Sequence, residues 1–358
     1  MDTLVLKTSD NETIYLYQSR FGCPADHPEA MKLCTFLLPT PLGPTPRVGV
    51  VCEGTIVDAT SSRVAWLERS LSREAALRIA QAQVPPDMVA LIGSGQLALD
   101  WVEESVQLVL RTGQDTTAGG ATTVYSDDEV KLVAPVPRPP GIACFVTWSA
   151  HIDDSRDKGY TMLNFPERGG DLRAYYKANP DAVEGPGTVI PRPNYATQTD
   201  VECEMAAVIG VGGKDLTDEE ARAAIVGYTI FNDVSYREIQ LREMAFGLGP
   251  TKGKDADRSN VLGPWLVTAD EVGDPANLTM SFAVNDHTIN SYNTSEMAWP
   301  FTDLAAYLSR GQTLRPGHIL TSGSFPGGSA LDAKIQLHSG DRITMRIEKL
   351  GALESTIG

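Results

Sequence analysis

Two glutamates stand two positions apart in the otherwise apolar run TDVECEMAAVIG. Such a run predicts a buried strand, and side chains two apart on a strand point to the same face. Glu202 and Glu204 would then lie side by side, where their like charges repel and burial disfavours ionisation. A divalent cation between them would relieve this repulsion. The spacing alone leaves open that both are surface residues of an edge strand.

A third acid and a lysine extend this pattern. Asp233 ends the apolar run YTIFND, as expected of a ligand at a strand terminus, and Lys254 lies in the Gly-rich stretch GPTKGKDADRSN. Acidic oxygen donors without clustered His or Cys suit Mg²⁺, Mn²⁺ or Ca²⁺ better than Zn²⁺. A lysine beside such a cation can donate to negative charge developing on a substrate oxygen. Taken singly, Lys254 could equally be a solvated loop residue.

The elements around these residues are mostly short strands. From residue 141 onward, apolar runs such as GIACFVTW, GPWLVTADE and RITMRIEKLG recur between glycines and prolines. One helix interrupts them, opened by the capping box Thr217-x-x-Glu220 and closed by Gly227. This pattern predicts a predominantly β (α+β) fold, a sandwich or β-roll, and not a doubly wound parallel sheet.

The N-terminal part has a different character. Short β-like runs up to about residue 60 precede two helical stretches, SREAALRIAQAQ and QLALDWVEESVQLVL. The proline-rich segment VAPVPRPPG then predicts a stiff connector. We therefore expect a smaller N-terminal α+β domain over residues 1–135 and a catalytic domain over residues 136–358. Within the latter, the polar, Gly-rich stretch 151–195 is typical of a disordered loop or a functional lid.

Several motifs in consistent order resemble the fumarylacetoacetate hydrolase family over roughly residues 130–358. They are the E-x-E of VECEMAAVIG, GYTIFNDVSYREIQLRE, GKDADRSNVLGPWLVTADE, SGSFPGG and GDRITMRIEKLG. The resemblance implies a mixed β-sandwich/β-roll catalytic domain of that family's type. It also implies a homodimer, for which the sequence itself shows no interface.

The resemblance assigns roles to individual residues. It implies that Glu202, Glu204 and Asp233 bind the metal and that Lys254 contacts a substrate oxygen. The spacings resemble those of the acylpyruvate hydrolase branch, and this implies that Arg237 and Gln240 bind substrate. Ser324 stands where the family commonly has threonine in a G-T-P turn, which implies a substrate contact by its hydroxyl.

The family also suggests a base. His151 in TWSAHIDD is similar to the histidine of the family's N-Y-x-x-H-x-x-E motif, and Asp154 would replace the glutamate that orients it. The shorter aspartate reaches less far, so this pair would be looser or depend on closure of the loop. His151 would activate water as a general base.

These residues predict a divalent-metal-dependent hydrolase that cleaves a carbon–carbon bond in a 1,3-diketo or 2-oxo acid through a metal-stabilised enolate. The same enolate also serves lyases and isomerases, so a 2-keto-3-deoxy sugar-acid dehydratase, an oxaloacetate decarboxylase or a tautomerase is an alternative. A second alternative is a relative that binds a metal without catalysis.

Composition narrows the possible partners. The 358 residues include 30 basic and 46 acidic ones, a net charge of −16, which disfavours binding to nucleic acids and to anionic membranes. No apolar run reaches membrane-spanning length and the first residues do not resemble a signal peptide, so we expect a cytoplasmic protein. The expected partner is a small 2-oxo or diketo acid.

Overall fold

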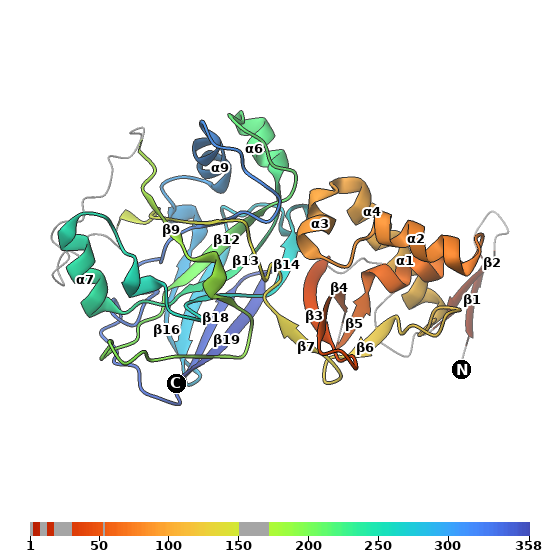
Figure 1. The fold of residues 1–358 in the computed structure, drawn as a ribbon, viewed down its shortest axis with the longest axis horizontal. Helices are drawn as coiled ribbons and strands as arrows, with labels where there is room; N and C mark the ends of the chain where they lie inside the picture. Colours follow the sequence, from red (N-terminus) through yellow and green to blue (C-terminus); the bar gives the residue numbers. More distant parts are fainter. Residues whose placement is uncertain (1–2, 8–12, 18–30, 53, 150–171) are drawn as a thin grey trace. The chain divides into compact units, whose positions relative to one another are not determined.

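The computed structural model describes residues 3–7, 13–17, 31–52, 54–149 and 172–358. The chain divides into two compact units, Met1–Leu132 and Val133–Gly358 (Figure 1). No helix within the described ranges is long and apolar enough to cross a membrane.

In its described residues, the N-terminal unit combines a small antiparallel sheet with four helices. Its sheet has the order β3-β4-β5-β6, and a separate hairpin pairs β1 with β2. The strands are β1 (Thr3–Lys7), β2 (Thr13–Tyr17), β3 (Lys32–Leu38), β4 (Thr45–Cys52), β5 (Thr55–Asp58) and β6 (Val124–Ser126), with β7 (Lys131–Val133) at the unit's end. The helices are α1 (Ala59–Leu67), α2 (Arg73–Gln83), α3 (Met88–Gly93) and α4 (Gln96–Thr112). This unit is α+β, as its sequence predicts.

The C-terminal unit contains the sheet that carries the acidic motif. Its strands follow the order β14-β13-β12-β17-β8-β9. They are β8 (Ile142–Phe145), β9 (Tyr175–Ala178), β12 (Cys203–Ile209), β13 (Ile225–Asp233), β14 (Asn260–Thr268) and β17 (Ile319–Thr321). After β9 the chain passes through η1 (Pro180–Ala182) into β10 (Val183–Glu184), which pairs with β14 at the opposite end of the path. The sheet therefore curls back on itself and encloses one face.

A second, five-stranded sheet completes this unit. Its order is β11-β19-β18-β15-β16, and β18 and β19 contact β13 and β14 of the first sheet. The strands are β11 (Thr188–Ile190), β15 (Thr279–Val284), β16 (His287–Asn293), β18 (Arg342–Ile347) and β19 (Gly351–Ile357). Large apolar side chains on both sheets, such as Phe231, Leu262 and Met345, are completely buried. The predominantly β, α+β fold predicted from the sequence is confirmed.

The C-terminal unit holds more helices than the one that its sequence predicts. Besides α6 (Asp218–Ala224) it contains α7 (Arg237–Phe246), α8 (Ala269–Val272) and α9 (Phe301–Ser309), with short turns η2 (Lys252–Lys254) and η3 (Thr294–Glu296). The sequence does not predict helix α7, because Gln240 is its one buried residue. An exposed helix of this kind shows no apolar stripe.

The capping box of α6 is confirmed, but the predicted end of this helix is wrong. Thr217 and Glu220 cap each other reciprocally, whereas the helix ends at Ala224 and the chain continues directly into β13. Gly227 lies within that strand. A Cβ atom there would stand 2.3 Å from the Val267 carbonyl oxygen of β14. Glycine is therefore needed for the close approach of two strands.

We expect Gly227→Ala to lower the free energy of unfolding by about 1–3 kcal/mol, because one of the two strands must shift to admit the methyl group. Denaturant unfolding followed by circular dichroism measures this change. Gly213→Ala is the matched control, since its Cβ would meet only the flexible end of the Leu216 side chain. A Gly227→Ala variant as stable as the wild type would contradict this account of the glycine.

Candidate active site

Strand register brings the three acids together. β12 and β13 are antiparallel, and the Asp233 N–H donates to the Glu202 carbonyl oxygen at 3.1 Å, which sets Glu202 opposite Asp233. Glu204, two residues further along, faces the same side. One carboxylate oxygen from each of the three residues lies within 4.8 Å of the others.

The cluster is deeply buried. The exposed fractions are 6% for Glu202 and 1% each for Glu204 and Asp233. β12 lies between β13 and β17, so it is an interior strand. The alternative that these acids are surface residues of an edge strand is therefore wrong.

Burial and mutual repulsion act on the protonation of these acids. Burial raises the pKa of Glu204, and the charges of Asp233 and Glu202 raise it further. Burial also raises the pKa of Asp233, although Lys254 partly offsets this effect. Three ionised carboxylates at this site therefore require positive charge nearby.

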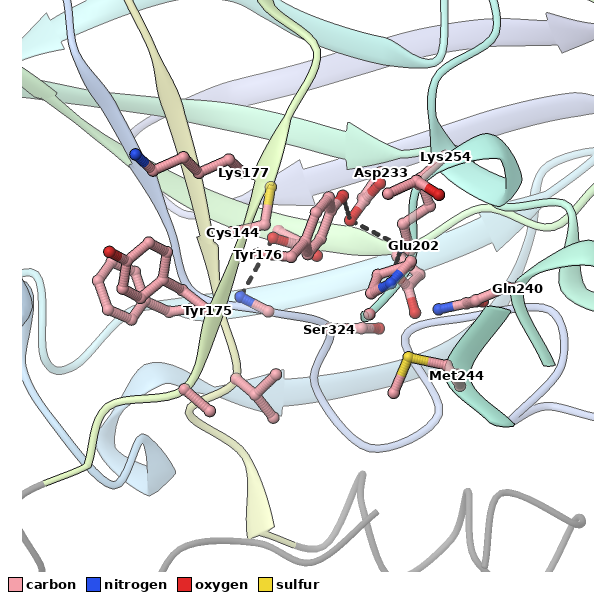
Figure 2. A pocket seen from close by; sticks show the side chains of 18 of the residues that line it. Cys144, Tyr175, Tyr176, Lys177, Glu202, Asp233, Gln240, Met244, Lys254 and Ser324 are labelled. Carbon is pink, nitrogen blue, oxygen red and sulfur yellow. Dashed lines mark hydrogen bonds and ion pairs between the residues drawn. The ribbon is translucent and has the colours of Figure 1, made fainter. Parts of the chain in front are cut away.

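Lys254 supplies one such charge. It lies on η2, is almost completely buried, and its Nζ atom is 2.5 Å from Glu202 Oε2 and 2.7 Å from Asp233 Oδ2 (Figure 2). Burial lowers the pKa of this lysine, but Asp233 and Glu202 raise it, and the net result lies above the ordinary value. Lys254 is consequently charged whenever these carboxylates are.

Arg237 and Gln240 come from the first turn of α7. An Arg237 guanidinium nitrogen is 2.8 Å from Glu202 Oε1, and the same group contacts Asp200 at 2.5 Å. Arg237 also donates to Gln240 Oε1 at 2.9 Å. These contacts bring both predicted substrate-binding residues to the acid cluster.

Helix α7 and the loop that bears Lys254 are joined by one carboxylate. Glu243 accepts the backbone N–H groups of Thr251, Lys252 and Gly253, at 2.7–3.0 Å. Burial raises the pKa of Glu243, but these hydrogen bonds together bring it below its ordinary value. Arg237 and the loop of Lys254 are thus both anchored to helix α7.

The donor set fits a hard divalent cation. Asp233 Oδ1 is buried and has no hydrogen-bond partner among the described residues, so it is poised to coordinate a cation. Glu204 accepts the Thr321 hydroxyl and the Gly323 N–H, both at its Oε2 atom. The cluster offers carboxylate oxygens alone, which are the ligands of Mg²⁺, Mn²⁺ and Ca²⁺.

The cluster opens into a cavity of about 660 Å³. Ser324, the last predicted substrate-binding residue, lines this cavity together with the acids, Lys254, Arg237 and Gln240. Apolar side chains such as Phe145, Trp148 and Met244 also line it, as do Tyr175, Tyr176 and Lys177. The predicted base His151 and its partner Asp154 lie outside the described residues.

Two residues at the site have no signal in the sequence. Tyr176 donates its hydroxyl hydrogen to Asp233, and Thr321 donates to Glu204. Burial, and next the charge of Asp233, raise the pKa of Tyr176 above its ordinary value. Both residues reach the acids through the order of strands in the sheet, which no local spacing reveals.

Comparison with known proteins identifies the family. The model of the fumarylacetoacetate (FAA) hydrolase C-terminal domain matches residues 145–358. The chain belongs to the fumarylacetoacetate hydrolase family. The resemblance of its motifs is thereby confirmed.

Members of this family that resemble the chain carry different activities. The mitochondrial oxaloacetate tautomerase Fahd2a of Rattus norvegicus is 33% identical over 278 residues, 75% of this chain and 79% of the relative. The human mitochondrial oxaloacetate tautomerase FAHD2A is 32% identical, over 64% of this chain and 70% of its own. A putative hydrolase of Burkholderia multivorans is 39% identical over 172 residues, and the match spans 60% of its length.

Solved structures share the fold. A fumarylacetoacetate hydrolase from psychrophilic Exiguobacterium antarcticum has 25% identity and a TM-score of 0.66, covering 92% of this chain and 99% of that one. Maleylpyruvate hydrolase from Sphingobium sp. SYK-6, solved in complex with manganese (II) ion and pyruvate, has 24% identity and a TM-score of 0.63, with 91% and 98% covered.

The buried acids predict how stability depends on pH when a chelator removes metal ions. Because the folded-state pKa of Glu204 is raised, its contribution to stability is complete below the unfolded-state value and is lost as pH rises through the folded-state value. Each unit of upward shift corresponds to about 1.4 kcal/mol. Thermal unfolding in EDTA from pH 4 to pH 8 measures this loss.

Glu204→Gln should make the metal-free protein more stable at pH 8 and flatten this decline, since the amide cannot ionise. Glu103→Gln, at an exposed position of α4, is the control and should leave the pH dependence unchanged. If the stability of the metal-free wild type rose steadily over this pH range, the raised pKa of Glu204 would be contradicted.

Proposed function

We propose that the chain is a divalent-metal-dependent hydrolase that cleaves a carbon–carbon bond in a 1,3-diketo or 2-oxo acid, of the acylpyruvate or fumarylacetoacetate type. The observation that carries this proposal is the placement of the Lys254 ammonium against two of three clustered carboxylates at the wall of one cavity. The manganese (II) ion and pyruvate bound to the maleylpyruvate hydrolase of similar fold support a metal and a 2-oxo acid here.

Glu202, Glu204 and Asp233 would hold the cation, which we propose to be Mg²⁺, with Mn²⁺ or Ca²⁺ as substitutes. A cation held there would polarise the two neighbouring oxygens of a 2-oxo acid and stabilise the enolate form of the substrate. Asp233 Oδ1, which has no hydrogen-bond partner within the described ranges, supports this assignment.

Lys254 would stabilise negative charge on the substrate. An ammonium has three N–H donors, and Glu202 and Asp233 accept two of them. The third can point to a substrate oxygen on which charge develops during attack. Gln240 at the cavity wall would add a further donor, and Arg237 would contribute positive charge while holding Glu202.

Water activation would fall to His151. In the proposed reaction this residue takes a proton from water while Asp154 orients its ring, and the hydroxide attacks the distal carbonyl carbon. The carbon–carbon bond then breaks, its electron pair stays on the 2-oxo fragment, and a proton completes that product. A general base accelerates such a reaction by about 10²–10⁴-fold. The cation and Lys254 would therefore have to supply the larger share of the rate enhancement.

A tautomerase is the second candidate, because two relatives that match most of their length are oxaloacetate tautomerases. That reaction moves a proton between carbon and oxygen of the same 2-oxo acid. It needs the acid cluster and Lys254, but no attack by water. The two candidates therefore differ in their need for His151.

Three further predictions accompany this function. We propose that catalysis resides in residues 136–358, that the protein is a homodimer, and that it acts in the cytoplasm. Light scattering of the purified protein tests the homodimer directly, and a monomer at micromolar concentration would rule it out.

Lys254→Met should lower turnover by about 10²–10³-fold, the loss usual for removing one donor to a developing oxyanion. Product mass, measured with Mg²⁺ on a panel of acylpyruvates, fumarylacetoacetate and oxaloacetate, shows which reaction occurs. Lys252→Met is the control, because Lys252 is exposed and bonds Asp255. Unchanged turnover of every substrate by Lys254→Met would refute the mechanism.

His151→Ala separates the two candidate functions. We expect this substitution to lower the rate of acylpyruvate cleavage by more than about 10²-fold, because the attacking water then lacks its general base. Interconversion of enol and keto oxaloacetate, followed by ultraviolet absorbance, should be unaffected in a tautomerase whose proton transfer needs no histidine. If the wild type interconverts oxaloacetate and cleaves none of the panel, the tautomerase is the correct function.

A further inference from the structure

Neither the sequence motifs nor the proposed mechanism gives a role to Tyr176, which contacts the acid cluster. It lies on β9, directly opposite Cys144 of β8, and Cys144 is in turn opposite Thr321 of β17. Residues opposite one another across a sheet share a face. Tyr176 therefore lies on the enclosed face that carries Thr321 and the acids, and the curl of the sheet brings β9 toward the end of β13.

Its neighbour Tyr175 lies on the other face. The Tyr175 ring packs against Phe145, with centroids 5.0 Å apart, and 37% of the residue is exposed. Figure 2 shows Tyr176 directed at the acid cluster and Tyr175 well away from it. Two adjacent tyrosines thus differ in whether they can reach the acids.

The Tyr176 hydroxyl and Lys254 meet at one oxygen atom. The hydroxyl donates to Asp233 Oδ2 at 2.6 Å, and Lys254 Nζ is 2.7 Å from the same oxygen. Lys254 Nζ also lies 5.4 Å from the centre of the Tyr176 ring, within the range of a cation–π contact. The other oxygen, Oδ1, is the buried atom without a partner in the described part of the chain.

Glu204 shows the same division. Its Oε2 atom accepts from both the Thr321 hydroxyl and the Gly323 N–H. In Asp233 and in Glu204, two donors hold one oxygen. Such outer contacts fix the rotation of a carboxylate and thereby decide which oxygen a cation meets.

We propose that Tyr176 is a positioning residue of the metal site: its hydroxyl holds Asp233 so that Oδ1 is presented to the cation, and its ring supports the Lys254 ammonium. This inference rests on the proposed metal-dependent function. Without the hydroxyl, Lys254 would be the one remaining described donor at Oδ2, and the carboxylate could rotate about its Cβ–Cγ bond.

Tyr176→Phe tests the hydroxyl, with Tyr175→Phe as the matched control on the neighbouring residue. Binding of Mn²⁺, measured by electron paramagnetic resonance, should weaken by about 10–100-fold in Tyr176→Phe and by less than twofold in Tyr175→Phe. The melting temperature in EDTA should be the same in all three proteins. A general loss of packing would instead lower it.

The outcomes distinguish this inference from the function beneath it. A wild type that binds no Mn²⁺ overturns both. A wild type that binds Mn²⁺, with Tyr176→Phe equal to it or tighter, overturns the role of Tyr176 alone. If Tyr176→Phe melts at a lower temperature in EDTA than the wild type, Tyr176→Leu serves as the second variant. If the Mn²⁺ affinity of Tyr176→Leu falls by no more than that of Tyr175→Phe, the inference is overturned.

Discussion

Repulsion among three buried carboxylates is the constraint on which the C-terminal unit depends. The antiparallel register of β12 and β13 forces Glu202, Glu204 and Asp233 onto one enclosed face, where water cannot screen them. Lys254 and Arg237 bring opposite charge to that face, and hydroxyl and backbone donors hold individual oxygens. Carboxylate oxygens clustered in this way are the donor set that suits a hard divalent cation.

The sheet order explains how residues so distant in sequence converge. β17 and β8 pair in parallel between the antiparallel pairs on either side, and β10 returns the chain to β14. Donors from β9 and β17 consequently face acids on β12 and β13. The geometry that encloses the acids also supplies the groups that orient them.

The sequence could predict the acids and Lys254, but it could not predict the hydroxyl groups that hold the acids. The E-x-E spacing and the position of Asp233 at the end of an apolar run are local patterns, and the structure brings these three acids together. Tyr176 and Thr321 depend on which strands are neighbours, and that order is a long-range property. Gly227 illustrates a different failure: a glycine after a helical pattern usually ends a helix, whereas here it admits a neighbouring strand.

The anchoring of the Lys254 loop by Glu243 has a consequence for how this site can change. Arg237 begins α7, and Glu243 on the same helix carries the loop of Lys254. The Arg237 guanidinium and the Lys254 ammonium are therefore both tied to α7. A displacement of this helix would move both groups away from the acids together. A change at the surface of α7 that shifts the helix would therefore alter the balance of charge around the acids, even though that surface lies outside the site.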